Sequence, residues 1–207
     1  MGLGPPARTS STETSSFSES QGSRSAQQQV ARAAELRKVH EAFAWFRSHT
    51  RELEDLQLEV TSIAAPPWGE AARSAWLEAR FSDLALTDVH QDELGNVFGI
   101  RPGTDPNAPY IALSAHVDTV FPAGTPIEVR RDAGKLFGPG VSDNSSGIVA
   151  LLGIAGAMQA ANLSNAAPIL LIGDVGEEGE GDLRGMRHIF QQPKWSEIGR
   201  ASCRERV

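Results

Sequence analysis

The sequence predicts an α/β fold in which helices cover both faces of a mostly parallel mixed sheet. Two short apolar runs, residues 110–117 and 168–173, are bounded by turn residues and are typical of strands buried on both faces. Segments with helical periodicity precede and separate these runs. Helices that alternate with buried strands indicate a layered α/β domain, in which ligands bind beyond the carboxyl ends of the strands.

The other elements follow from periodicity. Apolar residues at three- and four-residue intervals predict one long helix over residues 28–58, which ends before the Pro66-Pro67 pair. A second helix is predicted over 69–86, and alternation over 87–100 predicts a hairpin. An edge hairpin, an apolar helix and the start of a last helix are predicted over residues 127–137, 145–162 and 182–190.

The two ends of the chain differ from the part between them. Residues 1–28 are of low complexity, with eleven Ser or Thr in the first 26, and are interpreted as a disordered tail. A wrongly assigned start codon explains this segment equally well. Residues 197–207 resemble the in-frame translation of a sequencing-library adapter, the alternative being an ordinary basic tail. The folded part is therefore expected at 29–196.

Composition excludes several classes of protein. Nineteen Lys and Arg against 26 Asp and Glu give a net charge of −7, which argues against general binding of nucleic acid or an acidic membrane. The one cysteine, Cys203, excludes an intramolecular disulfide and a cysteine-based zinc finger. The start of the chain lacks the apolar core of a secretory signal, so a cytoplasmic location is expected.

Three polar clusters follow predicted strands or turns. His116 and Asp118 are two residues apart and so share one face of an extended chain, where the carboxylate can fix the tautomer of the imidazole. Asp143 lies in the Gly-rich run 138–147, where a helix N-cap is the alternative interpretation. Residues 174–182 contain five acidic side chains, and an exposed acidic loop is the alternative to a metal site.

Together the clusters indicate a metal site. His116, Asp143 and Glu178 supply one imidazole and two carboxylates, spaced by 27 and 35 residues. Borderline divalent ions accept both ligand types, and two ions bridged by a carboxylate form a known hydrolytic arrangement. Glu177, next to a ligand, is free to act as a general base.

The same motifs resemble a known family. The segments 116–120, 138–144, 177–179 and 181–185 are similar to those of co-catalytic zinc exopeptidases and amidohydrolases. That family includes peptidase T, glutamate carboxypeptidase, aminoacylase and succinyl-diaminopimelate desuccinylase. The resemblance covers residues 53–190, so residues 29–196 are expected to be the N-terminal part of a catalytic domain.

The resemblance implies a role for each matching residue. His116 would bind one of two zinc ions, with Asp118 supporting it, and cobalt or manganese could replace zinc. Asp143 would bridge the ions, Glu178 would bind the second ion, and Glu177 would be the general base. The expected substrates are small peptides or N-acyl amino acids.

The resemblance also implies parts that the sequence does not show. A smaller dimerisation domain, through which the intact protein could form a homodimer, and two further ligands, a carboxylate and a histidine, are not found. We therefore expect the chain as given to be truncated and inactive. A metal-free binding or regulatory homologue and a non-functional fragment are the alternatives. Four histidines without convergent partners in the sequence are interpreted as surface or boundary residues: His40, His49, His90 and His188. Three tryptophans are interpreted as packing residues and not as a platform for a substrate: Trp45, Trp68 and Trp76.

Overall fold

The computed structural model describes residues 26–105 and 107–195, which fall into two units, residues 1–40 and 41–207. In the first unit, residues 26–34 are helical and α2 (Arg37–Ser48) begins. Residues 1–25 of the expected tail and the whole adapter-like segment lie outside the described residues. Within the described ranges, no helix is both long and apolar enough to cross a bilayer.

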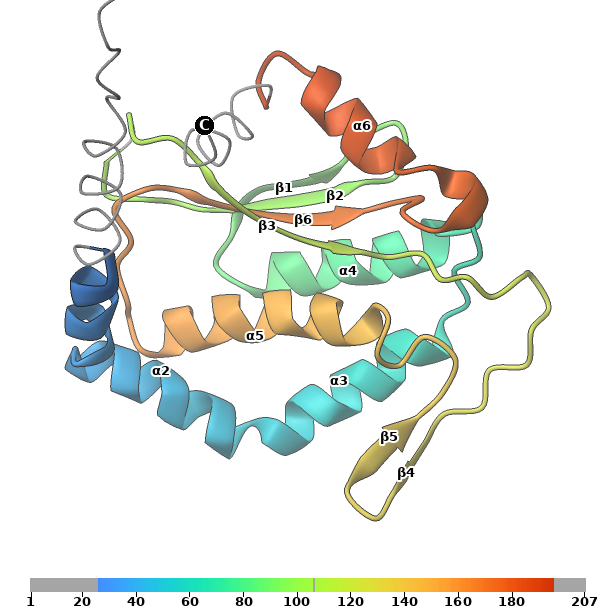
Figure 1. Cartoon of the computed structure of the whole chain (residues 1–207), viewed down its shortest axis with the longest axis horizontal. Coiled ribbons are helices and arrows are strands. Elements are labelled where there is room, and N and C mark those ends of the chain that lie inside the picture. Colours follow the sequence, from blue (N-terminus) through green and yellow to red (C-terminus); the bar gives the residue numbers. More distant parts are fainter. Residues whose placement is uncertain (1–25, 106, 196–207) are drawn as a thin grey trace, which may run out of the picture. The chain divides into compact units, whose positions relative to one another are not determined.

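The second unit is built on a four-stranded sheet with the strand order β1-β2-β6-β3 (Figure 1). β3 and β6 are parallel, whereas β1 with β2 and β2 with β6 are antiparallel. The expectation of a mostly parallel sheet was therefore wrong for the described strands, because β2 runs antiparallel to both of its neighbours, to β1 across the predicted hairpin and also to β6. The strands are β1 (Thr87–Gln91), β2 (Val97–Arg101), β3 (Ile111–His116) and β6 (Ile169–Asp174).

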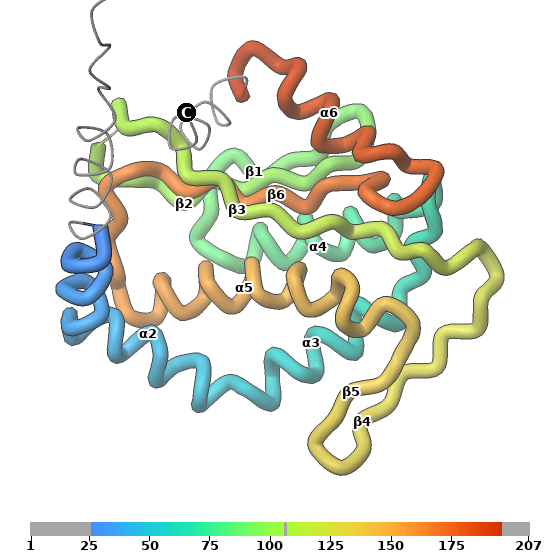
Figure 2. Tube along the Cα trace, viewed as in Figure 1, coloured from blue at the N-terminus to red at the C-terminus, as the bar shows by residue number. Residues whose placement is uncertain are grey.

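Helices cover both faces of this sheet, as predicted. α4 (Ala71–Asp83) packs on β1 and β2, α5 (Ser145–Ala160) packs on β3, and α3 (Thr50–Ser62) packs on α5. α6 (Arg184–Gln191) lies on the opposite face (Figure 1). A separate hairpin of β4 (Arg130–Asp132) and β5 (Lys135–Phe137) leaves the body of the unit between β3 and α5 (Figure 2).

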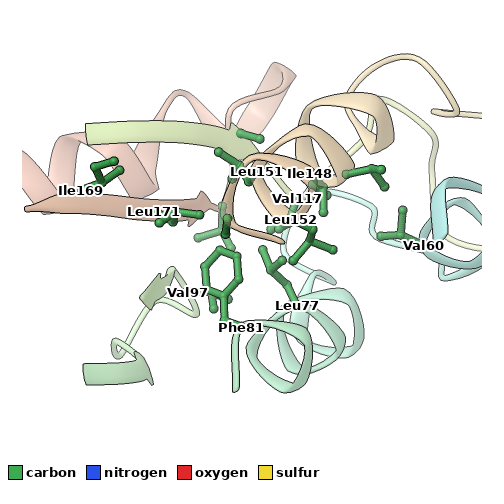
Figure 3. Close-up of a cluster of buried hydrophobic side chains, with 14 residues drawn as sticks. Val60, Leu77, Phe81, Val97, Val117, Ile148, Leu151, Leu152, Ile169 and Leu171 are labelled. Atoms are coloured by element: carbon green, nitrogen blue, oxygen red, sulfur yellow. The ribbon is translucent and has the colours of Figure 1, made fainter. Parts of the chain in front are cut away.

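The core consists of two clusters on opposite faces of β6. Leu171 belongs to the cluster under α4 and α5, and Leu170 and Ile172 belong to the cluster under α6. All six residues of β6 are buried, which confirms the strand predicted over 168–173. Figure 3 shows the larger cluster, whose labelled members include Leu77, Phe81, Ile148 and Leu171.

β3 differs from the strand that was predicted. Its first residues are exposed or half-buried, and Ile111 is 52% exposed to solvent. The prediction that both faces of the strand are buried was therefore wrong for this part. The reason is its position, because among the described strands β3 pairs with β6 alone. Only Ala115 and His116, at the carboxyl end of the strand, are buried.

The long helix expected over residues 28–58 is interrupted. α2 ends at Ser48 and α3 begins at Thr50, because His49 adopts the non-helical angles φ −108° and ψ 12°. The His49 ring stacks on Trp45 at 4.1 Å, and its Nδ1 lies 2.8 Å from the Trp45 carbonyl oxygen. Apolar periodicity continues through the break, so it does not reveal where one helix ends.

Replacing Leu77 with alanine should destabilise the second unit by about 2–5 kcal/mol. Leu77 is fully buried, and its Cδ2 lies so close to Gly173 that a Cβ built on that glycine would be 2.3 Å away. Because the side chain fills tightly enclosed space, its removal leaves a cavity. Urea unfolding measures the loss, with Leu94→Ala as the control. Leu94 is 36% exposed, and similar losses for both variants would contradict this packing.

Candidate metal centre

The candidate site lies where β3 and β6 end. The two strands are parallel, and their register pairs His116 with Asp174, so the loops that follow them leave the same edge of the sheet. The start of α5 lies at this edge as well (Figure 2). This topology brings together the three polar clusters, although they are far apart in the sequence.

Asp118 is the buried support of the site. Its side chain is inaccessible to solvent, and its two carboxylate oxygens each accept one backbone N–H. The N–H of Glu177 donates to Oδ1 at 3.0 Å, and the N–H of Glu178 donates to Oδ2 at 2.8 Å. Burial opposes ionisation, but the contact with His116 and these two hydrogen bonds lower the pKa of Asp118. One carboxylate thus fixes the start of the acidic loop against the end of β3.

His116 lies between two carboxylates. Its Nδ1 is 3.1 Å from the Asp118 carbonyl oxygen and 3.6 Å from Asp118 Oδ1. Its Nε2 is 2.9 Å from Oδ1 of Asp143. Burial lowers the pKa of His116, but the hydrogen bonds of Asp118 and Asp143 and the negative charges of Asp118 and Glu177 outweigh burial and raise the pKa to about 9. The ring therefore faces a buried acceptor on one side and an accessible carboxylate on the other.

The N-cap of α5 is Asn144 and not Asp143. The Asn144 side chain accepts the backbone N–H of Gly147 at 3.1 Å. The Asp143 side chain is 74% exposed and contacts His116. The capping role that the sequence left open for Asp143 therefore belongs to its neighbour, and the Asp143 carboxylate is directed to the site.

The acidic loop divides between the site and the surface. His116, Glu177 and Glu178 each place one ligand atom so that all three atoms lie within 4.8 Å of one another. Burial and the charges of Asp143 and Glu177 raise the pKa of Glu178. Farther along the loop, Asp182 pairs instead with Arg187 at 2.9 Å. One imidazole with crowded carboxylates is a donor set that suits zinc.

Two buried polar residues near the site were not found from the sequence. Arg73 on α4 is 1% exposed and donates to the backbone carbonyls of Ile63 and Val117. Asp174 ends β6, and burial raises its pKa to about 6. A single arginine in an amphipathic helix carries no pattern that separates it from a surface residue, and Asp174 was counted only as one of the acidic residues of the loop.

Two interpretations from the sequence need correction. Trp68 is not a packing residue, because it is 68% exposed. His188 does have partners, since its Nε2 lies 3.0 Å from Oε1 of Glu93 and 3.9 Å from Oδ2 of Asp92. Asp92 holds the turn after β1 by accepting the backbone N–H groups of Leu94 and Asn96. Both features arise from tertiary placement, which periodicity does not encode.

Comparison with known proteins finds a similarity to one family of peptidases. Residues 112–204 match the model of the peptidase family M20/M25/M40. The matched segment contains His116, Asp118, Asp143 and both adjacent glutamates. This part of the chain is similar to that family of peptidases and amidohydrolases.

The chain is also similar to individual proteins. The chain is 33% identical over 139 residues to an N-carbamoyl-L-amino-acid amidohydrolase of Paenarthrobacter aurescens, covering 66% of this chain and 29% of that protein. A tripeptidase of Staphylococcus aureus is 25% identical with a TM-score of 0.53, covering 64% of this chain and 40% of that one. Aminopeptidase PepT of Bacillus cereus has the same fold, with 24% identity, a TM-score of 0.54 and coverage of 61% and 36%. The chain thus spans less than half the length of these relatives.

Proposed function

We propose that the intact protein is a metal-dependent hydrolase that cleaves amide bonds in small peptides or N-acyl amino acids. The observation that carries this proposal is that His116, Glu177 and Glu178 each place one ligand atom within 4.8 Å of the other two. In addition, Oδ1 of Asp143 lies 2.9 Å from Nε2 of His116. The names of two relatives, an amidohydrolase and a tripeptidase, both denote hydrolysis, and support the same reaction class.

The side chains fit a two-zinc centre, in which cobalt or manganese could take the same ligands. His116 and Glu178 would each hold one ion and Asp143 would bridge them. Asp118 would keep the His116 ring oriented through its Nδ1 side. When bound, the ions would supply Lewis-acid polarisation of the scissile carbonyl and an acidified water.

Glu177 is suited to move the protons of the reaction. Its backbone N–H is held by Asp118 at 3.0 Å, so the start of its side chain is fixed beside the ligands. In the proposed mechanism its carboxylate accepts a proton from the attacking water and later delivers it to the leaving nitrogen. Glu178, the next residue, is held in the same way by the other oxygen of Asp118.

The 207-residue chain should bind zinc through His116 without turning over substrate, because it spans only 29–40% of relatives whose names denote hydrolysis. His116→Ala should weaken zinc binding at least about tenfold, since even indirect partners of ligands commonly contribute 10–100-fold. Isothermal titration calorimetry with zinc chloride on the metal-free chain measures this.

His188→Ala is the matched control, because His188 also lies beside two carboxylates, Asp92 and Glu93. Its zinc affinity should stay within about twofold of the parent chain. If His188→Ala abolished binding and His116→Ala did not, zinc would bind elsewhere and the proposal would fail. Absence of zinc binding by the parent chain would favour a metal-free homologue.

A further inference from the structure

A cleft of about 580 Å³ opens beside the candidate metal centre. Glu178, assigned above as a ligand, lines the cleft, so the cleft and the metal centre share a wall. The rest of the lining is mainly apolar and comes from the loop before α4 and the loop after β3. The lining residues on which the argument rests are Pro66, Trp68, Val120, Pro122, Glu178 and Glu180.

Trp68 is held in place although it is 68% exposed. Its backbone N–H donates to Oε1 of Glu70 at 2.9 Å, and the Arg184 guanidinium lies 4.2 Å from the centre of its ring. Arg184 in turn donates to the same oxygen of Glu70 at 2.7 Å. The Glu70 and Arg184 side chains are only 6% and 14% exposed, so the two residues that hold Trp68 are themselves fixed in the protein.

The backbone at Trp68 is also unusual. Its φ of 69° lies in the left-handed region, which bulky residues rarely adopt. Such a conformation costs free energy and persists where surrounding contacts impose it. The contacts here fix a large aromatic ring at the mouth of a cleft and not in the core. An aromatic surface held in this way loses little side-chain entropy when a ligand binds to it.

We propose that this cleft receives an apolar side chain of the amide substrate, preferably an aromatic one, and that Trp68 is a specificity-determining residue. The inference rests on the proposed function for the identity of the occupant, because Glu178 would place the reacting amide next to the cleft. Val120 is 59% exposed and adds a second apolar surface. The negative charge of Glu180 at the lining disfavours substrates with an acidic side chain.

The test uses the metal-free 207-residue chain and small neutral amides. The indole N–H signals of the four tryptophans are followed by NMR during titration with N-acetyl-L-phenylalaninamide, and Trp68→Phe identifies the signal of Trp68. This signal should shift saturably with the phenylalanine probe and much less with N-acetylglycinamide. The signal of Trp45, which lines a groove between α2, α3, α4 and α5, is the internal control and should not shift.

Trp68→Ala should weaken binding of the phenylalanine probe about fivefold or more, and Trp68→Phe should stay within about threefold of the parent chain. These affinities are read from methyl signals of Val120 so that all variants share one reporter. Because Trp68 is exposed, neither variant should lower the melting temperature noticeably. Equal shifts by the glycine and phenylalanine probes, or unchanged affinity in Trp68→Ala, would overturn the proposal.

The two proposals fail in different ways. Zinc calorimetry on the His116 variant tests the metal centre, whereas the NMR titration needs no metal. If the phenylalanine probe binds selectively at Trp68 but the chain does not bind zinc, the proposed role of the cleft is supported and the proposed metal-dependent hydrolase is wrong. If zinc binds normally and the two amide probes bind equally well at Trp68, the proposed hydrolase function stands and the proposed role of the cleft is wrong.

Discussion

Replacing Asp118 with asparagine should destabilise the metal-free protein by about 3–5 kcal/mol, the range found when one partner is removed from a buried charged network. Asp118 is fully buried and accepts hydrogen bonds from Glu177 and Glu178. An asparagine amide has one oxygen and one NH₂ group, so one of these backbone N–H groups would face a donor and remain unpaired. The variant also removes the negative charge near His116 and the buried Arg73.

The measurement is urea unfolding in the presence of a chelator, so that metal binding does not contribute to stability. Asp132→Asn is the matched control, because Asp132 is 67% exposed and pairs with Arg130 on the surface of the β4–β5 hairpin. Its effect should be within about 1 kcal/mol. If Asp118→Asn were as mild as this control, the two hydrogen bonds to the acidic loop would not hold that loop.

Much of the site could be predicted because its chemistry is local in the sequence. His116 and Asp118 are two residues apart on an extended segment, and Glu177 and Glu178 lie three and four residues beyond the end of β6, whose first five residues are uncharged. Since strand ends gather at one edge of a sheet, residue type and element order together indicate a shared site. β6 was predicted correctly for the same reason, because burial on both faces leaves a continuous apolar run.

What could not be predicted depends on the partner that each segment meets. β3 is apolar in sequence but lies beside one described strand only, and Ile111 is exposed. Trp68 and His188 take their environments from residues more than 90 positions away, namely Arg184 and Glu93. At the break between α2 and α3, the His49 ring stacks on Trp45, and the apolar pattern of the sequence continues through this point.

The buried charges at the site form one connected arrangement. Asp118 joins the end of β3 to the acidic loop, and Arg73 joins α4 to the same region by donating to the Val117 carbonyl at 3.1 Å. Burial lowers the pKa of Arg73 to about 10, and the negative charge of Asp118 acts in the opposite direction. The start of α4 and the ends of β3 and β6 are therefore held together by polar groups. Hydrogen bonds fix the direction of these contacts, which apolar packing alone would not do.

Replacing Arg73 with methionine should accordingly destabilise the protein by about 3–5 kcal/mol. Methionine fills much of the same volume, so the loss reports on hydrogen bonds more than on packing. Arg73 donates to Ile63 O through Nε at 3.1 Å and Nη2 at 2.6 Å, and to Val117 O through Nη1. Without these donors, two carbonyl groups lose partners and the charge of Asp118 loses one of the positive charges near it.

Arg80→Met is the matched control, because Arg80 lies two turns farther along α4 and is 35% exposed. Its ion pairs with Glu59 at 2.8 Å and Asp83 at 3.4 Å are accessible to solvent. Their loss should therefore lower the free energy of unfolding by no more than about 1 kcal/mol. Thermal and urea unfolding of both variants, again with a chelator, measure the difference. Equal losses would mean that the buried arginine contributes no more than a surface ion pair. The larger expected loss in Arg73→Met follows because solvent can replace the partners of Arg80 but cannot reach those of Arg73.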